Sequence, residues 1–141
     1  MYSHNPKSIS ASWGAGLCHP LPLIAVLVTA INDHWLKGSG VIAASVTGKL
    51  SDVAGLFFFP MLLVALWFGG ERLLGKRSCL DRGVPALACC VTALVFTMVN
   101  LSSSINDISA AMGMVKVMDP SDLWALPVLL LSWRWLERVY A

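Results

Sequence analysis

The sequence predicts an all-α integral membrane protein, built as a bundle of four transmembrane helices. Hydrophobic residues make up 57% of the 141 residues and charged residues only 13%, whereas a soluble domain carries about 25% charged residues. The mean hydropathy is +0.71, and the apolar residues gather in four runs. This composition supplies too little charge to cover a soluble surface, and it is too apolar for a disordered chain.

The four runs cover residues 21–36, 53–70, 84–101 and 123–139. A spanning helix needs about 20 mostly apolar residues, because the hydrocarbon core is about 30 Å thick. The second run carries no charge, and the third lies within a longer uncharged stretch. Arg134 interrupts the fourth run, which therefore spans only if Arg134 and Arg138 extend their aliphatic stems to the interface.

The first run is predicted to remain as an uncleaved helix. Only Lys7 charges the segment before it, and no small-x-small cleavage pattern follows it around Asn32–Lys37. We therefore expect residues 1–141 to form a single transmembrane domain with four crossings.

Charge placement predicts the orientation, with both termini in the cytoplasm. The membrane that we expect is the inner membrane of a bacterium. Four crossings put seven basic residues on the side of the termini: Lys7, Arg72, Lys76, Arg77, Arg82, Arg134 and Arg138. The other side holds three: Lys37, Lys49 and Lys116. The positive-inside rule makes the first side cytoplasmic. Tryptophans mark both interfaces, with Trp35 and Trp124 outside and Trp13, Trp67, Trp133 and Trp135 inside.

The two halves of the chain share a short pattern that is consistent with a repeated helical hairpin. Each half has Asn-Asp where its first helix ends, Ser-Asp where its second helix begins, and a proline inside that second helix. These residues are 32–33, 51–52 and Pro60 in the first half, and 106–107, 121–122 and Pro127 in the second. Repeats of two spans each would be parallel, related by an axis along the membrane normal.

The predicted outer face carries the candidate polar site: Asn32, Asp33, His34, Lys49, Asp52, Asp107 and Asp122. In one interpretation the acids only cap helices. Ser51 then starts one helix, and residues 119–122 form an N-cap, a first-turn proline and an acid near the helix dipole. In the other, the four aspartates ring an outward-facing funnel that attracts cations or holds a proton-transfer pair. Gly55 and Ala125 would let backbones approach closely below that ring.

No cofactor or metal site is predicted. The segment Val46–Ser51 lacks the upstream glycine of a phosphate loop, and the sequence has no Gly-x-Ser-x-Gly, His-Glu-x-x-His or Cys-x-x-Cys. The four cysteines lie on the cytoplasmic side or within the third run, which is typical of reduced thiols. A net charge of +2 offers no basic face for nucleic acid.

Three segments of the sequence are similar to segments of known membrane proteins: Asn32–Lys37, Thr47–Leu56 with Pro60, and Asp119–Leu123. With them the chain resembles a group of small four-span bacterial membrane proteins with the signature NDHxLK…TGKLSDxAGL, a resemblance that implies a fold but no activity. It is similar more weakly to VanZ-like proteins, also small and four-spanning with acidic motifs at helix ends. Their later Glu and Gln pairing has no match here, so no site residue is carried over.

Two classes of function fit these observations. The first is a non-enzymatic membrane component, either a subunit of a complex or a small oligomeric pathway for ions or solutes. The alternative is a membrane enzyme that acts on a lipid-linked substrate at the outer face, with paired aspartates as acid and base. An enzyme should keep its carboxylates together near a lipid-accessible cleft, whereas a pathway needs polar residues continuing to the cytoplasmic side. The lipid bilayer is one expected partner. Because a bundle of four helices leaves much of each helix surface uncovered, we also expect a homo-oligomer or a larger membrane complex.

Overall fold

The fold is known from a computed structural model, which describes residues 16–37, 39–75, 83–111 and 119–140. Every regular element in these ranges is a helix, which confirms the all-α prediction. The elements are α1 (Pro20–Ile31), the π-helical η2 (Asn32–Leu36), α2 (Ala44–Leu73), α3 (Val84–Leu101), α4 (Ser103–Ala111), the 3-10 helix η3 (Pro120–Ala125) and α5 (Val128–Tyr140).

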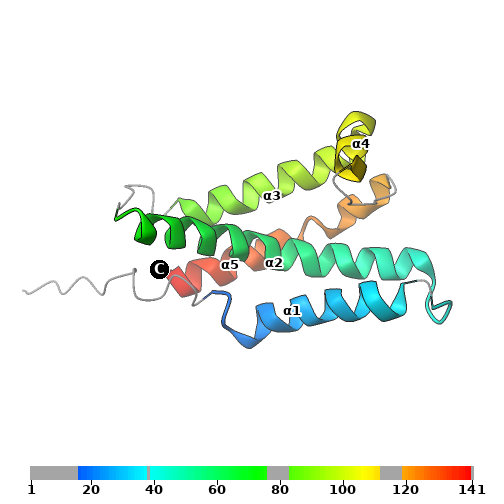
Figure 1. Cartoon of the computed structure of the whole chain (residues 1–141), viewed down its shortest axis with the longest axis horizontal. Helices are drawn as coiled ribbons and strands as arrows, with labels where there is room; N and C mark the ends of the chain where they lie inside the picture. The colour runs from blue at the N-terminus through cyan, green and yellow to red at the C-terminus, as the bar shows by residue number, and fades with distance from the viewer. Residues whose placement is uncertain (1–15, 38, 76–82, 112–118, 141) are drawn as a thin grey trace, which may run out of the picture.

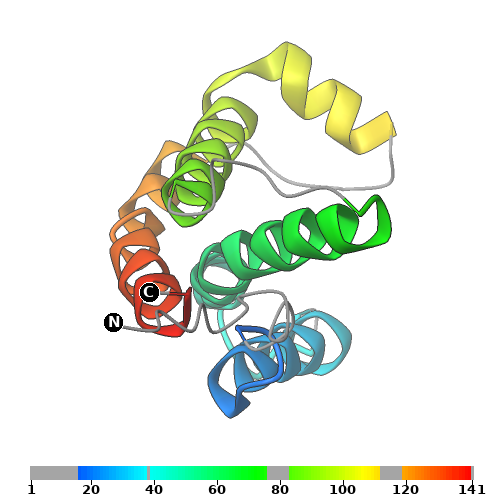
Figure 2. The same ribbon diagram turned by 90° about the vertical axis from the view of Figure 1, so that its left-hand side faces the viewer.

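Four segments run along the long axis of the bundle in alternating directions (Figure 1): α1 with η2, α2, α3, and η3 with α5. Helix α2 is the centre of the bundle, because it packs against α1, α3 and α5. Figure 2 shows α1 on one side of α2, and α3 with α5 on the other. We call the end of the bundle that holds η2, the start of α2 and η3 the η end; α2 and α5 finish at the opposite end.

Two of the predicted runs fit the structure closely, and two fit it only in part. The third run, 84–101, coincides with α3, and the first corresponds to α1 continued by η2. Helix α2 begins at Ala44, nine residues before the second run, and its first turns include Gly48. The turn before it contains Gly40, whose φ of 73° is a left-handed conformation that glycine adopts at little cost.

The fourth run is interrupted. Residues up to Ala125 belong to η3, and α5 starts only at Val128. Pro127 lies between the two elements and not inside a helix, because a proline has no N–H to continue the ladder. The backbone crosses this point through short-range bonds: Leu126 N donates to Leu123 O at 3.1 Å, and Leu129 N to Leu126 O at 3.0 Å.

Two apolar clusters form the interior. The main core lies toward the opposite end and contains Met61, Val64, Phe68, Val84, Ala88, Cys89 and Leu136. A smaller cluster near the η end contains Leu56, Ala125 and Leu129. Both clusters draw on α2, which explains its central position in the bundle.

Two helices are long and apolar enough to cross a membrane: α2 from Ser45, and α3. Only 39% of the apolar window of α2 and 28% of that of α3 are buried, so most of their apolar surface faces outward. Helix α1 with η2 is apolar but shorter. This arrangement agrees with the membrane class that the composition predicts.

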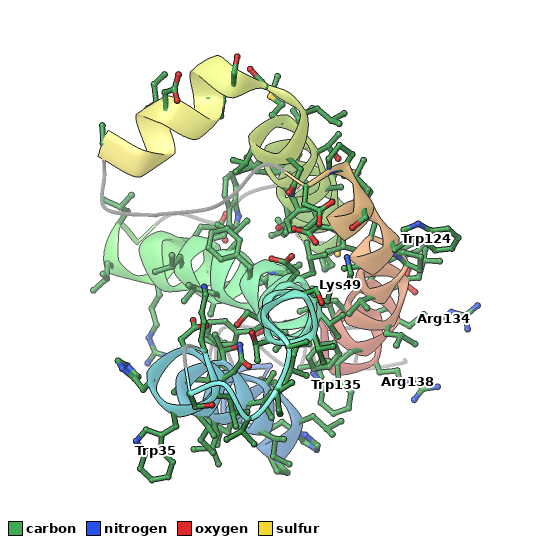
Figure 3. All side chains as sticks on the ribbon, turned by 90° about the vertical axis from the view of Figure 1, so that its right-hand side faces the viewer. Trp35, Lys49, Trp124, Arg134, Trp135 and Arg138 are labelled. Atoms are coloured by element: carbon green, nitrogen blue, oxygen red, sulfur yellow. The ribbon has the colours of Figure 1, made fainter. Side chains whose placement is uncertain are left out.

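Most of the predicted interfacial residues that the structure describes lie on the surface, but Trp135 is half-buried against the main core. Trp35 and Trp124 are 77% and 86% exposed at the η end, and Arg134 and Arg138 point away from α5 (Figure 3). Cys18, Cys89 and Cys90 are free thiols. Several residues used for the topology and thiol predictions lie outside the described ranges: Lys7, Trp13, Lys76, Arg77, Cys79, Arg82 and Lys116.

Candidate functional site

Helix α1 does not stop at the predicted Asn-Asp pair but widens there into the π-helical turn η2. The amide of Lys37 donates to the carbonyl of Asn32 at 2.8 Å, five residues back. Such π-turns are rare and often occur at functional sites. Here the turn places the side chain of Asn32 in the interior, with 0% of the residue exposed.

A first polar network joins η2 to α2. The Asn32 side-chain nitrogen Nδ2 donates to the carbonyl of Thr47 at 2.7 Å and to Ser51 Oγ at 2.6 Å. Ser51 Oγ in turn donates to Asp33 Oδ1 at 2.8 Å. The amide oxygen of Asn32 is buried and accepts no hydrogen bond from any described residue. We call this set the Asn32 network.

A second polar network joins α2 to η3. Lys49 Nζ donates to Ser121 Oγ at 2.7 Å and lies 3.3 Å from Asp122 Oδ1. Asp122 is 9% exposed, whereas 45% of the Lys49 side chain is accessible. Figure 3, which looks at the η end, shows Lys49 between α2 and η3. We call this set the Lys49 network.

The capping interpretation is right for η3 and wrong for α2. Asp119 is the N-cap of η3, because its side chain accepts from Ser121 N at 2.8 Å, and Pro120 follows in the first turn. Ser51 caps nothing: α2 starts seven residues earlier, with Ala43 at its N-cap. Asp52 therefore sits two turns inside a helix, where the helix dipole no longer explains a carboxylate.

The predicted outer-face residues separate into different surroundings. Ser51 and Lys49 are two positions apart on α2, about 200° around the helix, so the two networks face different neighbours. His34 is exposed on η2, and Asp107 is exposed on α4. Of the four aspartates, Asp33 and Asp122 thus belong to separate networks. No group of three His, Cys, Asp or Glu side chains that could hold a metal occurs among the residues described.

The third feature near the η end is a groove between α2 and α3, which the sequence analysis did not predict. It is partly open, measures about 270 Å³, and is lined mainly by apolar side chains: Ser51, Asp52, Gly55, Leu56 and Phe59 of α2, and Thr92, Val95, Phe96 and Val99 of α3. Asp52 is half-buried at the end of the groove that is nearest η2. The i, i+4 spacing of Ser51, Gly55 and Phe59 was the sequence signal for one shared helix face.

Gly55 and Ala125, the two small residues predicted to allow close packing of helices, lie in different surroundings. Ala125 is buried in the cluster near the η end. A Cβ atom at Gly55 would meet no atom of another element within 4 Å, so this glycine opens onto the groove instead of touching a neighbouring helix. The expected close approach at Gly55 is therefore wrong.

Polar groups do not continue from the η end to the opposite end through the described interior. Thr92 Oγ1 donates within its own helix to Ala88 O at 2.8 Å. Ser132 Oγ donates to the carbonyl of Phe57 at 2.9 Å, one turn before Pro60. Beyond these two hydroxyls the main core is formed by apolar side chains.

No protein-family model, curated protein or solved structure matches the chain. The resemblances based on the NDHxLK…TGKLSDxAGL signature, and the weaker one to VanZ-like proteins, therefore stay predictions.

Proposed function

We propose that this chain is a multi-pass protein of the bacterial inner membrane, with both termini in the cytoplasm, and that it works as a non-enzymatic subunit of a membrane complex. The outward-facing apolar surfaces of α2 and α3 support the membrane placement. The seven-to-three distribution of basic residues supports the orientation.

One observation carries the choice of a subunit: two of the outer aspartates are used to hold helices together. Asp33 accepts from Ser51, and Asp122 pairs with Lys49. Carboxylates fixed in separate structural contacts do not form the adjacent acid and base that hydrolysis or transfer would need. The apolar main core is equally unfavourable for an ion or solute pathway through one chain.

The subunit role is tested by gentle extraction of the tagged full chain from its native membrane, followed by native mass analysis. We expect a second polypeptide at fixed stoichiometry. Recovery of the chain alone, or only as a homo-oligomer, would contradict the role.

The orientation is tested separately with two fusions to the full chain. A fluorescent protein that folds only in the cytoplasm should fluoresce after Ala141, and a phosphatase that folds only outside should be active when inserted after Gly40. The reverse pattern would refute the proposed topology but would leave the extraction result intact.

The alternative enzyme has one observation in its favour. Asp52 is not explained by capping, and it lines one end of the groove between α2 and α3. Farther along the same groove, Phe59 and Val95 are 44% and 50% exposed. Reconstituted protein incubated with total bacterial lipid should leave every lipid mass unchanged if the subunit role is correct. A lipid whose headgroup mass changes with the wild type and not with Asp52→Asn would favour the enzyme.

A further inference from the structure

The groove between α2 and α3 is apolar along almost all of its length, with its charged residue at one end. Ser51 and Asp52 line it at the η end, and Phe59 lies at the other end of its α2 wall. Thr92, a third polar residue of the lining, already directs its hydroxyl to Ala88 O. The Ser51 hydroxyl is likewise held in the Asn32 network. The charged group of the lining is therefore Asp52, at the η end above an apolar floor formed by Leu56, Phe96 and their neighbours.

We propose that this groove binds one acyl chain of a phospholipid in the outer leaflet, with the Asp52 carboxylate beside an ammonium headgroup such as that of phosphatidylethanolamine. The inference rests on the proposed membrane placement and orientation, but not on the subunit role.

The dimensions of the groove select one lipid chain over a transmembrane helix. From Ser51 to Phe59 the α2 wall rises by about 12 Å, at about 1.5 Å per residue, which is close to the roughly 15 Å of one leaflet. A partner helix would pack along both leaflets. The volume of about 270 Å³ is just below the about 300 Å³ at which pockets for whole small molecules begin. It therefore suits one chain and not a complete lipid.

Charge selects the headgroup. A carboxylate has about four acceptor positions, so Asp52 can bind an ammonium in addition to contacts within the protein. Lys49, one turn before Asp52 on α2, is directed to Ser121 and Asp122. An anionic headgroup such as phosphatidylglycerol brings no cation to the Asp52 carboxylate, whereas an ammonium forms a charge-assisted hydrogen bond there.

Two glycines of α2 provide a matched pair of variants. A side chain at Gly55 would enter the groove, and one at Gly48 would not, because Gly48 does not line it. At both positions a Cβ atom meets nothing within 4 Å, so neither substitution creates a backbone clash. Leucine also raises helix propensity equally at both sites. The intended difference between the two variants is therefore that Gly55→Leu fills the groove and Gly48→Leu does not.

The test uses the full chain reconstituted in vesicles of equal parts phosphatidylethanolamine and phosphatidylglycerol, then released gently for native mass analysis of bound lipid. We expect wild type and Gly48→Leu to retain one phosphatidylethanolamine, and Gly55→Leu to lose about tenfold in occupancy. Asp52→Asn should keep the bound chain but lose its headgroup preference by about tenfold. Asp107→Asn, a charge change on exposed α4, should alter neither.

Three results would overturn the proposal. Equal lipid retention by Gly55→Leu and Gly48→Leu would show that the groove is not the binding site. Equal retention of the two lipids by the wild type would exclude headgroup selection by Asp52. A homodimer that Gly55→Leu dissociates would identify a second copy as the occupant. The subunit role is tested on a different sample, the chain extracted from its native membrane, so loss of lipid binding and loss of the subunit role are read separately.

Discussion

The two ends of the bundle are held together by different chemistry. At the η end, hydrogen bonds between side chains or from side chain to backbone join α2 to η2 and η3, beside the small apolar cluster of Leu56, Ala125 and Leu129. At the opposite end, α2, α3 and α5 meet through apolar packing around Met61 and Leu136, with aromatic rings of Phe68 and Tyr140 5.3 Å apart. In a bilayer, packing supplies most of the association energy, while polar bonds fix which residues meet. We therefore expect the packed end to contribute most of the stability, and the η end to fix the register in which the helices meet.

The largest expected effect is at the packed end. Leu136 is 0% exposed in the main core, and Leu136→Ala should lower the free energy of unfolding by about 2–5 kcal/mol, because it leaves a cavity. The measurement is unfolding of the detergent-solubilised chain by an SDS titration followed by circular dichroism. Leu130→Ala, at a residue 59% exposed on the same helix, is the control and should cost far less. Equal losses from the two variants would contradict the assignment of the core.

The positions of the helices were predictable because each depends on a local pattern. Run length located α3 to the residue, and the combination Asp119-Pro120 located the start of η3. The start of α2 was not predictable in the same way. A Ser-Asp pair is a common helix start. The extension of the helix beyond the apolar run is the part that Asn32 contacts through Thr47 and Ser51, residues distant from it in sequence.

The candidate site was predictable as a set of residues but not as an arrangement. Which neighbour each polar group meets depends on contacts between helices distant in sequence, such as Lys49 with Asp122. The proposed repeat illustrates this limit: Ser51 and Asp52 lie inside α2, whereas Ser121 and Asp122 belong to the 3-10 helix η3. The same dipeptide is therefore placed on different elements.

The second prediction tests whether a buried amide contributes more to stability when it bonds to another helix than when it bonds within its own helix. Asn32 and Asn100 are both fully buried amides whose side-chain oxygen accepts no hydrogen bond from the described part of the chain. Asn32 bonds to α2, whereas Asn100 donates to Phe96 O in its own helix. Asn32→Leu should therefore cost about 1–2 kcal/mol in the same titration, and Asn100→Leu less. A larger loss from Asn100→Leu would overturn this account of the η end.

The third prediction concerns the contact between α2 and η3. A double-mutant cycle with Lys49→Met and Asp122→Asn should give a coupling of about 0.5–1 kcal/mol. We expect this coupling free energy to be as small as that of surface ion pairs, because 45% of the Lys49 side chain is accessible. Single variants include other contacts of Asp122, so the coupling is the quantity that tests the pair. No coupling, or one unchanged by high salt, would show that the contact is not electrostatic.

The smallest effect compares the two aspartates that the repeat pattern equates. Asp33 accepts a hydrogen bond from Ser51 at 2.8 Å, and Asp33→Ala should cost about 0.5 kcal/mol, the lower end for such a bond because the residue is exposed. Asp107 is exposed on α4, and Asp107→Ala should leave the SDS midpoint unchanged. Equal losses would mean that both aspartates hold their hairpins in the same way, and would restore the repeat as a structural unit. A loss at Asp33 alone would mean that only the first hairpin is closed by its Asn-Asp pair, through the π-turn that brings Asn32 and Asp33 against Ser51.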